Sequence, residues 1–182
     1  MNKISHWLGA FVACALAAVF AATAALADTP SAFCGTIDPE NATYRGIEGL
    51  EITLKDGEWE GAPYHPDGAA RPRVGLIRDI EICGDIDGDG ENETVVALWY
   101  ASGGSGTFQY LAVLEEGDNG PENTFTAPVG DRVRIEGGTI ADGMVRLDVI
   151  QHGPDEPACC PTQAVTRHYD ASLELVNTTE RN

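Results

Sequence analysis

The most constraining feature of this 182-residue sequence is a regular succession of short strand-forming segments and tight turns, which begins near residue 44. Segment 94–100 is apolar on both faces, as expected of a strand buried in the middle of a sheet. Asp56-Gly57 and Asp142-Gly143 are favoured two-residue hairpin turns. Helical periodicity is nearly absent. The sequence therefore predicts an all-β or strongly β-dominated fold, a single antiparallel sandwich- or barrel-like domain of about eight to ten strands.

The positions of turn residues predict where these strands begin and end. Residues 61–73 and 115–130 are rich in glycine and proline, so we expect both to be surface connections. The strands are expected at 51–55 and 58–60, paired across Asp56-Gly57, and then at 74–83, 94–100, 107–114, 132–135, 144–150, 164–169 and 173–176.

The first 27 residues are typical of an export signal. Lys3 precedes an apolar stretch over 7–25, and Ala25-Leu26-Ala27 has the small-residue pattern of a signal-peptidase site. An uncleaved anchor is the alternative, because the stretch is nearly long enough to span a bilayer. We expect residues 1–27 to be a signal peptide and 28–182 to be a single exported domain, periplasmic or secreted, with no membrane span of its own.

The charge balance excludes several classes of partner. The chain has 29 acidic and 11 basic residues and a net charge of −18. Removing residues 1–27 takes away one basic residue and no acidic one, which leaves about −19. Nucleic acids and anionic membranes need a basic surface, so neither is an expected partner. Cations would relieve the self-repulsion of such a chain.

An acidic loop precedes the most apolar segment. Asp85, Asp87 and Asp89 alternate, Gly90 follows, and the Glu91 carbonyl and the Glu93 carboxylate complete a set of oxygen ligands. Calcium takes six to eight such ligands, and a glycine permits the sharp turn that gathers them. An EF-hand does not fit, because position twelve would be Val96 and strands flank the loop. A solvated acidic turn is the alternative.

The pattern D-x-D-x-D-G-x-x-E running into a strand resembles the calcium loops of FG-GAP and VCBS-type β-repeats. The resemblance implies Ca²⁺ at Asp85, Asp87, Asp89, Glu91 and Glu93, and it covers the loop rather than the fold. A longer ordered set of segments resembles a family of uncharacterised exported bacterial proteins, which implies export and domain limits but no mechanism. These segments are NATY at 41–44, TLKDG at 53–57, GDIDGDG at 84–90, GGSGTF at 103–108, YLAV at 110–113, GDRV at 130–133, HGPD at 152–155 and CCPT at 159–162.

Four cysteines follow the signal, and an even count in an exported chain predicts disulfides. The adjacent Cys159 and Cys160 either form a vicinal bond or bridge to different partners, since neighbouring Cα atoms are only about 3.8 Å apart. We favour a Cys34–Cys83 bond. His152 with Cys159 and Cys160 is an alternative soft-metal or redox site.

These features favour a calcium-stabilised, non-enzymatic binding or accessory domain for an unknown protein or polymer ligand. The alternative is a hydrolase of envelope or extracellular polymers that uses acidic catalytic residues. Residues 102–107 form no nucleophile elbow, because Thr107 stands where that motif needs glycine. No catalytic residue is assigned. An open cleft of converging carboxylates at the loop would favour the enzyme, and a loop packed closely on the sheet would favour a structural ion.

Overall fold

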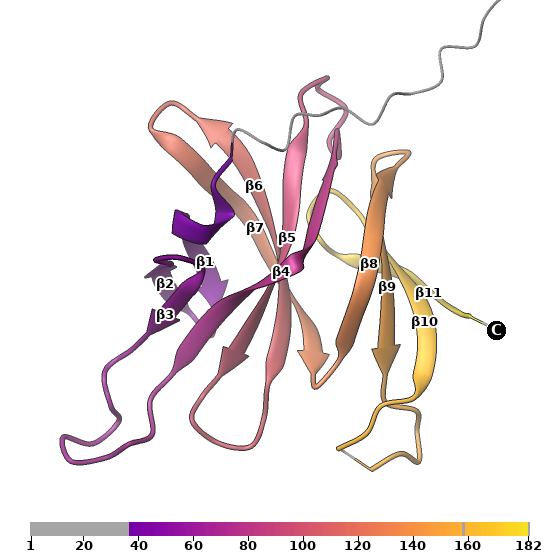
Figure 1. Cartoon of the computed structure of the whole chain (residues 1–182). Coiled ribbons are helices and arrows are strands. Elements are labelled where there is room, and N and C mark those ends of the chain that lie inside the picture. The colour runs from indigo at the N-terminus through magenta and orange to yellow at the C-terminus, as the bar shows by residue number, and fades with distance from the viewer. Residues whose placement is uncertain (1–36, 158, 182) are drawn as a thin grey trace, which may run out of the picture.

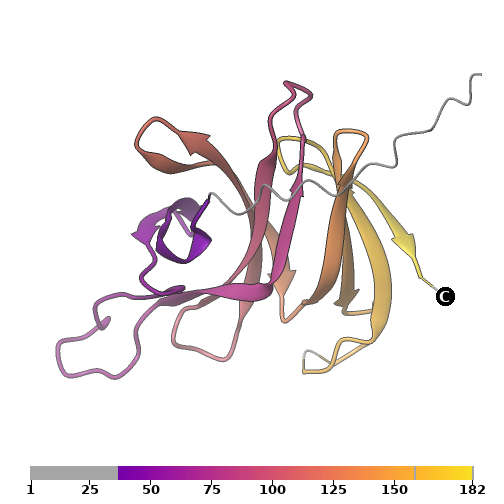
Figure 2. The same cartoon turned by 45° about the horizontal axis from the view of Figure 1, so that its top comes forward.

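The computed structural model describes residues 37–157 and 159–181, and the expected signal peptide lies outside them. The described chain is built from antiparallel sheets, with one short 3-10 helix, η2 (Pro39–Asn41). A five-stranded sheet, which we call the large sheet, lies between a hairpin on one face and a four-stranded sheet, the small sheet, on the other (Figures 1 and 2). The all-β antiparallel prediction is confirmed.

The strands group into three antiparallel sheets. The hairpin is β1 (Thr43–Ile47) with β2 (Leu50–Thr53). The large sheet, in spatial order, is β3 (Glu58–Glu60), β4 (Arg73–Gly84), β5 (Glu93–Ala101), β6 (Phe108–Gly117) and β7 (Gly120–Asp131). The small sheet, in spatial order, is β11 (Leu175–Glu180), β10 (Gln163–Tyr169), β9 (Met144–Gln151) and β8 (Arg134–Ala141).

Strand β5 is the middle of the large sheet and contributes to two apolar cores. Val95 and Ala97 face the core shared with the small sheet. Val96 and Leu98, on the opposite face, pack in the core under the β1–β2 hairpin. A strand covered on both faces needs apolar residues at successive positions, which is why 94–100 does not alternate. The prediction of a central buried strand is confirmed.

The predicted hairpin around Asp56-Gly57 is wrong in its pairing, although the turn is present. Asp56 and Gly57 both have positive φ, and Lys55 and Glu58 exchange backbone hydrogen bonds across them. Beyond that bridge the strands separate, because β2 pairs with β1 and β3 pairs with β4. The turn forms because of the residues in it. The pairing of β2 and β3 depends instead on the apolar core against which the apolar face of each strand packs.

The prediction of a surface connection over 115–130 is also wrong. These residues form the end of β6 and nearly all of β7, joined by a tight turn at Gly117–Gly120. β7 is an edge strand, and an edge tolerates Pro121 and Pro128 because one side of its backbone needs no ladder donor. The glycines and prolines therefore mark an edge strand and its bulges rather than a loop.

The small sheet packs against the large one partly through close backbone approaches. A Cβ on Gly138 of β8 would lie 2.5 Å from Cδ1 of Ile82 in β4, and a Cβ on Gly84 would lie 2.9 Å from Cβ of Ile140. Glycine at both positions lets β4 and β8 come together. This contact brings the end of β4, where the acidic loop begins, beside the small sheet.

Candidate metal centre

The acidic loop joins the end of β4 to the start of β5, at one end of the large sheet (Figure 1). Asp85 is half-buried, whereas Asp87 and Asp89 are exposed. Gly88 and Gly90 have φ values of +85° and +94°, the left-handed region that side chains rarely adopt. These two glycines turn the loop sharply enough to bring the aspartates together.

The loop is shaped by its own side chains as well as by glycine. Asp85 accepts hydrogen bonds from the Gly88 and Gly90 N–H groups, at 2.5 and 3.1 Å. Asp87 accepts from the Asp89 N–H at 3.0 Å, and Asp89 accepts from the Glu91 N–H at 2.8 Å. Asp87 and Asp89 thus each form a local side-chain turn with the N–H two residues on, while Asp85 binds the N–H groups of the two glycines farther along the loop.

The three aspartates offer oxygen ligands at one point. One carboxylate oxygen from each of Asp85, Asp87 and Asp89 can be chosen so that all three lie within 4.8 Å of one another. Atoms that bind one cation at 2.3–2.6 Å must lie no farther apart than roughly this distance. The sequence prediction that these residues gather at a possible metal site is therefore confirmed for the three aspartates.

The base of the loop is fixed by a buried pair of residues. The Ile86 side chain, 3% exposed, enters the core between the two sheets. The Glu93 carboxylate, 4% exposed, accepts the Ile86 N–H at 2.8 Å. Glu93 thus closes the loop across its ends, and the aspartates stand above an anchored base.

The electrostatics of the loop are unbalanced. Burial raises the pKa of Glu93; the Ile86 N–H opposes this shift, and the charges of Asp87, Asp89 and Asp85 add to it. Among the described residues, none of these four carboxylates forms an ion pair with lysine, arginine or histidine. A bound cation would supply the missing positive charge.

An open cavity of about 530 Å³ adjoins the loop. It is lined by Ile37, Asp89, Glu91, Asn92, Glu93, Glu115 and Glu116. Glu115 and Glu116 come from the end of β6, and sequence reasoning missed them because it assigned them to a connection. The sequence does contain a signal for these two residues, because they are consecutive acidic residues at the end of a strand that pairs with β5. The loop therefore has a closed base packed on the sheet and an open acidic side.

Glu91 and Glu93 occupy different places from the three converging aspartates. Glu91 is exposed and lines the cavity, while Glu93 lies below the loop. The three-ligand group that converges in the described structure consists of Asp85, Asp87 and Asp89. The assignment of Glu91 and Glu93 as ligands stays a prediction.

Cys159 and Cys160 are joined by a disulfide, which corresponds to the vicinal alternative. Cys83 is also held in a disulfide. Cys34 lies outside the described residues, so the Cys34–Cys83 pairing stays a prediction. Both ring nitrogens of His152 are buried, and neither has a hydrogen-bond partner among the described residues. Within 37–157 and 159–181, His152 and the cysteine pair do not form a convergent three-ligand group.

Comparison of the chain with protein-family models, with curated proteins and with solved structures finds no match. The two resemblances drawn from the sequence thus remain expectations. In the described part of the chain, no helix has the length and apolar character needed to cross a membrane.

Proposed function

We propose that this chain is an exported calcium-binding β-domain that acts without catalysis, as a binding or accessory module for a protein or polymer ligand. The observation that carries the proposal is the convergence of Asp85, Asp87 and Asp89 above an anchored base, with no basic side chain of the described residues paired to them. Export rests on the signal-like residues 1–27.

Calcium fits the chemistry of this loop better than other common ions do. The donors are oxygens, which excludes the soft ions that prefer thiolate and imidazole. Mg²⁺ demands near-ideal octahedral geometry, whereas Ca²⁺ accepts six to eight oxygens in a flexible arrangement. Three aspartates leave room for the Glu91 carbonyl, a Glu93 oxygen and water to complete such a set.

An ion at this position would stabilise the connection that leads into the middle strand of the large sheet. The loop connects β4 to β5, and β5 contributes to both apolar cores. An ion that binds the folded chain alone stabilises it by about 2.7 kcal/mol at a hundredfold excess over Kd. The open acidic cavity beside the loop is the surface on which a ligand of the loaded domain would dock.

Calorimetry of the exported protein with calcium and with a chelator tests this proposal. Calcium should raise the melting temperature by several degrees, and Asp87→Ala should remove most of that increase. Asp67→Ala is the matched control, because Asp67 is an exposed acid in the 61–72 loop. The proposal fails if wild-type melting is indifferent to calcium, or if the control loses the response as completely as Asp87→Ala.

The cavity supports a hydrolase as the second candidate. Its lining includes five carboxyl groups, and the pKa of Glu93 is raised, as a general acid requires. The acidic pair of such an enzyme would be sought among Glu93, Glu115 and Glu116. Release of reducing ends from cell-envelope polysaccharide, lost in Glu115→Gln while calcium-dependent melting persists, would favour this candidate over the binding module.

A further inference from the structure

The small sheet ends in an exposed edge strand. All six residues of β11 are exposed, and β10 is the one strand of the described structure that pairs with β11. Leu175 and Val176 are 53% and 60% exposed, two of the five large apolar side chains exposed in the described structure. Figures 1 and 2 both show β11 at the outer side of the molecule. Such an edge is a template for another strand.

The other long edges of the two main sheets are covered. The edge strand β7 of the large sheet packs against β1, where the Arg45 N–H donates to the Asn123 side chain at 2.9 Å. The edge strand β8 of the small sheet packs against β4 through Gly138 and Ile82. β11 has neither proline nor lysine, two residues that commonly protect an edge, and its one irregularity is the register shift at Val176, which leaves 177–180 in regular pairing with β10.

The hydrogen bonds of β11 show which backbone groups face away from β10. The N–H of Arg181, the residue after β11, donates to the Ala164 carbonyl of β10 at 3.0 Å, so the backbone groups of odd-numbered positions at this end point toward β10. The Thr178 N–H instead donates to the Asn177 side chain at 2.8 Å. Thr178 and, by alternation, Glu180 therefore direct their N–H and carbonyl groups toward the free edge.

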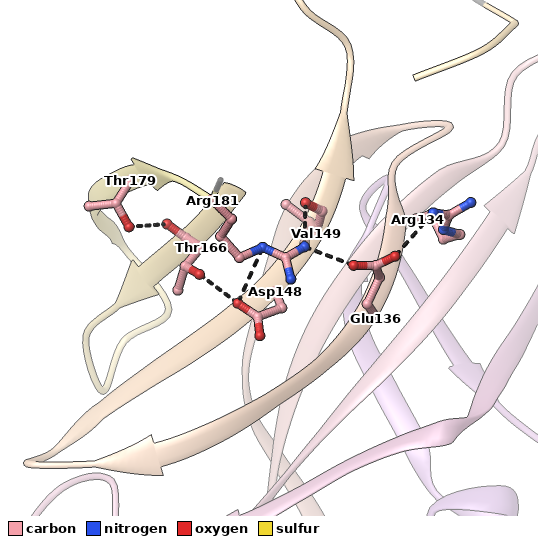
Figure 3. A network of polar contacts seen from close by, with 7 residues as sticks. All are labelled: Arg134, Glu136, Asp148, Val149, Thr166, Thr179 and Arg181. Atoms are coloured by element: carbon pink, nitrogen blue, oxygen red, sulfur yellow. Dashed lines mark hydrogen bonds and ion pairs between the residues drawn. The ribbon is translucent and has the colours of Figure 1, made fainter. Parts of the chain in front are cut away.

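The edge is held in place by a network across the small sheet (Figure 3). Arg181, directly after β11, donates to Glu136 of β8 at 2.8 Å and to the Val149 carbonyl of β9 at 3.3 Å. Thr179 donates to the Thr166 carbonyl at 3.4 Å. β11 is thus fastened to strands on its inner side, which leaves a preformed outer edge.

We propose that β11 is a self-association surface, on which a second copy of this chain adds its own β11 in antiparallel orientation. A two-fold axis beside Thr178 pairs Thr178 with Thr178 of the second copy, and Val176 with Glu180 of the second copy. Two backbone hydrogen bonds then form between the outward-facing Thr178 residues, and up to four more form where Glu180 meets Val176, the extra residue at the register shift of β11, so that the two sheets join into one of eight strands. A partner carbonyl takes the place of the Asn177 side chain at the Thr178 N–H.

The charges of β11 are compatible with a second copy of the same strand and favour this register over the adjacent one. Pairing at Thr178 sets Asn177 opposite Thr179 and sets no like charges opposite each other. A shift of the axis to Asn177 would set Glu174 against Glu180 of the second copy, which is unfavourable. Glu180 is the one charged residue of β11, and Arg181 follows it. The edge is therefore nearly neutral in a chain whose net charge of −18 opposes association elsewhere.

Sedimentation of the exported protein over a range of concentrations tests the proposal. The wild type should pass from monomer to dimer as concentration rises. Thr178→Pro removes an outward N–H that β10 does not use, and Val176→Lys adds charge to the edge; each should shift the protein to monomer with the β-sheet circular dichroism unchanged. Phe125→Lys is the control, since Phe125 is 42% exposed on a different strand, and it should still dimerise.

Cross-linking tests the register independently of stability. Thr178→Cys should give a reducible covalent dimer under mild oxidation, because the two positions face each other across the axis. Thr179→Cys should not, because that position meets Asn177. A wild type that stays monomeric at its highest attainable concentration overturns the proposal, as does a dimer that survives both edge substitutions. Equal cross-linking of the two cysteine variants also overturns it.

Discussion

Two groups of carboxylates in this molecule balance their charge in different ways. In the acidic loop, Asp85, Asp87, Asp89 and Glu93 lie together with no basic partner among the described residues. On the small sheet, Glu136 lies between Arg181 and Arg134, at 2.8 and 3.0 Å, and Asp148 lies 3.8 Å from Arg181 (Figure 3). We call the second group the arginine network.

The pKa shifts express the difference. Burial raises the pKa of Glu93 and the neighbouring aspartates add to the shift, whereas hydrogen bonds from Arg181 and Arg134 lower the pKa of Glu136. The arginine network carries its own cations, and the loop does not. Unlike the arginine network, the loop needs an added cation to balance its negative charge.

The largest expected effect is a difference in unfolding free energy between substitutions that detach each region from the rest of the fold. Ile86→Ala should lower the free energy of unfolding by about 2–5 kcal/mol, because it empties a buried position at the base of the loop. Arg181→Ala should cost no more than about 1 kcal/mol, since its ion pairs are partly exposed. Urea unfolding in chelator measures both. Equal losses would contradict the view that the loop, unlike the network, is anchored in the core.

Replacing an aspartate with asparagine should change the stability of the protein in opposite directions in the two regions. In ion-free protein, Asp87→Asn should raise stability by up to about 1 kcal/mol, because it removes a repelling charge and keeps the acceptor for the Asp89 N–H. Asp148→Asn should lower stability by about 0.2–1 kcal/mol, because Arg181 loses an anionic neighbour.

Thermal melting of both asparagine variants in chelator, and again with calcium, separates the cases. Calcium should reverse the advantage of Asp87→Asn over the wild type and leave the Asp148→Asn difference as it was. If Asp87→Asn destabilises the ion-free protein, repulsion does not govern the loop, and the contrast with the arginine network is lost.

The smallest expected effects are changes in folding stability with pH. Because the folded-state pKa of Glu93 is raised above its ordinary value of 4.5, the folded chain takes up this proton first, and stability increases as pH falls through that raised pKa. The lowered pKa of Glu136 has the opposite consequence. Its contribution is present above the ordinary value and is lost as pH falls through the lowered pKa.

Glu93→Gln and Glu136→Gln isolate these two contributions in ion-free protein. The wild type should gain stability relative to Glu93→Gln on acidification from pH 7 toward the ordinary glutamate pKa, and should lose stability relative to Glu136→Gln below it. Melting temperatures at matched pH values measure both differences. If the stability difference between wild type and variant changes with pH in the same direction for Glu93→Gln and Glu136→Gln, the two glutamate pKa values are not shifted in opposite directions.

Local patterns predicted a large part of this structure. The apolar positions of 94–100, the Asp142-Gly143 turn and the strand at 164–169 all correspond to observed elements, β5, the β8–β9 turn and β10. Asp85, Asp87 and Asp89 were also found from spacing alone, because their side-chain hydrogen bonds reach only two to five residues along the chain. Information of this kind is contained in a few consecutive residues.

Many of the strand positions, the turn chemistry and the acidic loop thus follow from the order of residues alone. The tertiary structure was needed to establish that β2 and β3 have different partners, that 115–130 becomes an edge strand, and that Arg181 reaches Glu136, 45 residues earlier. It also established that the Glu93 carboxylate is buried against the Ile86 N–H. Strand pairing, burial and long-range ion pairs depend on which surfaces meet when the chain collapses, and no short segment specifies its distant partner.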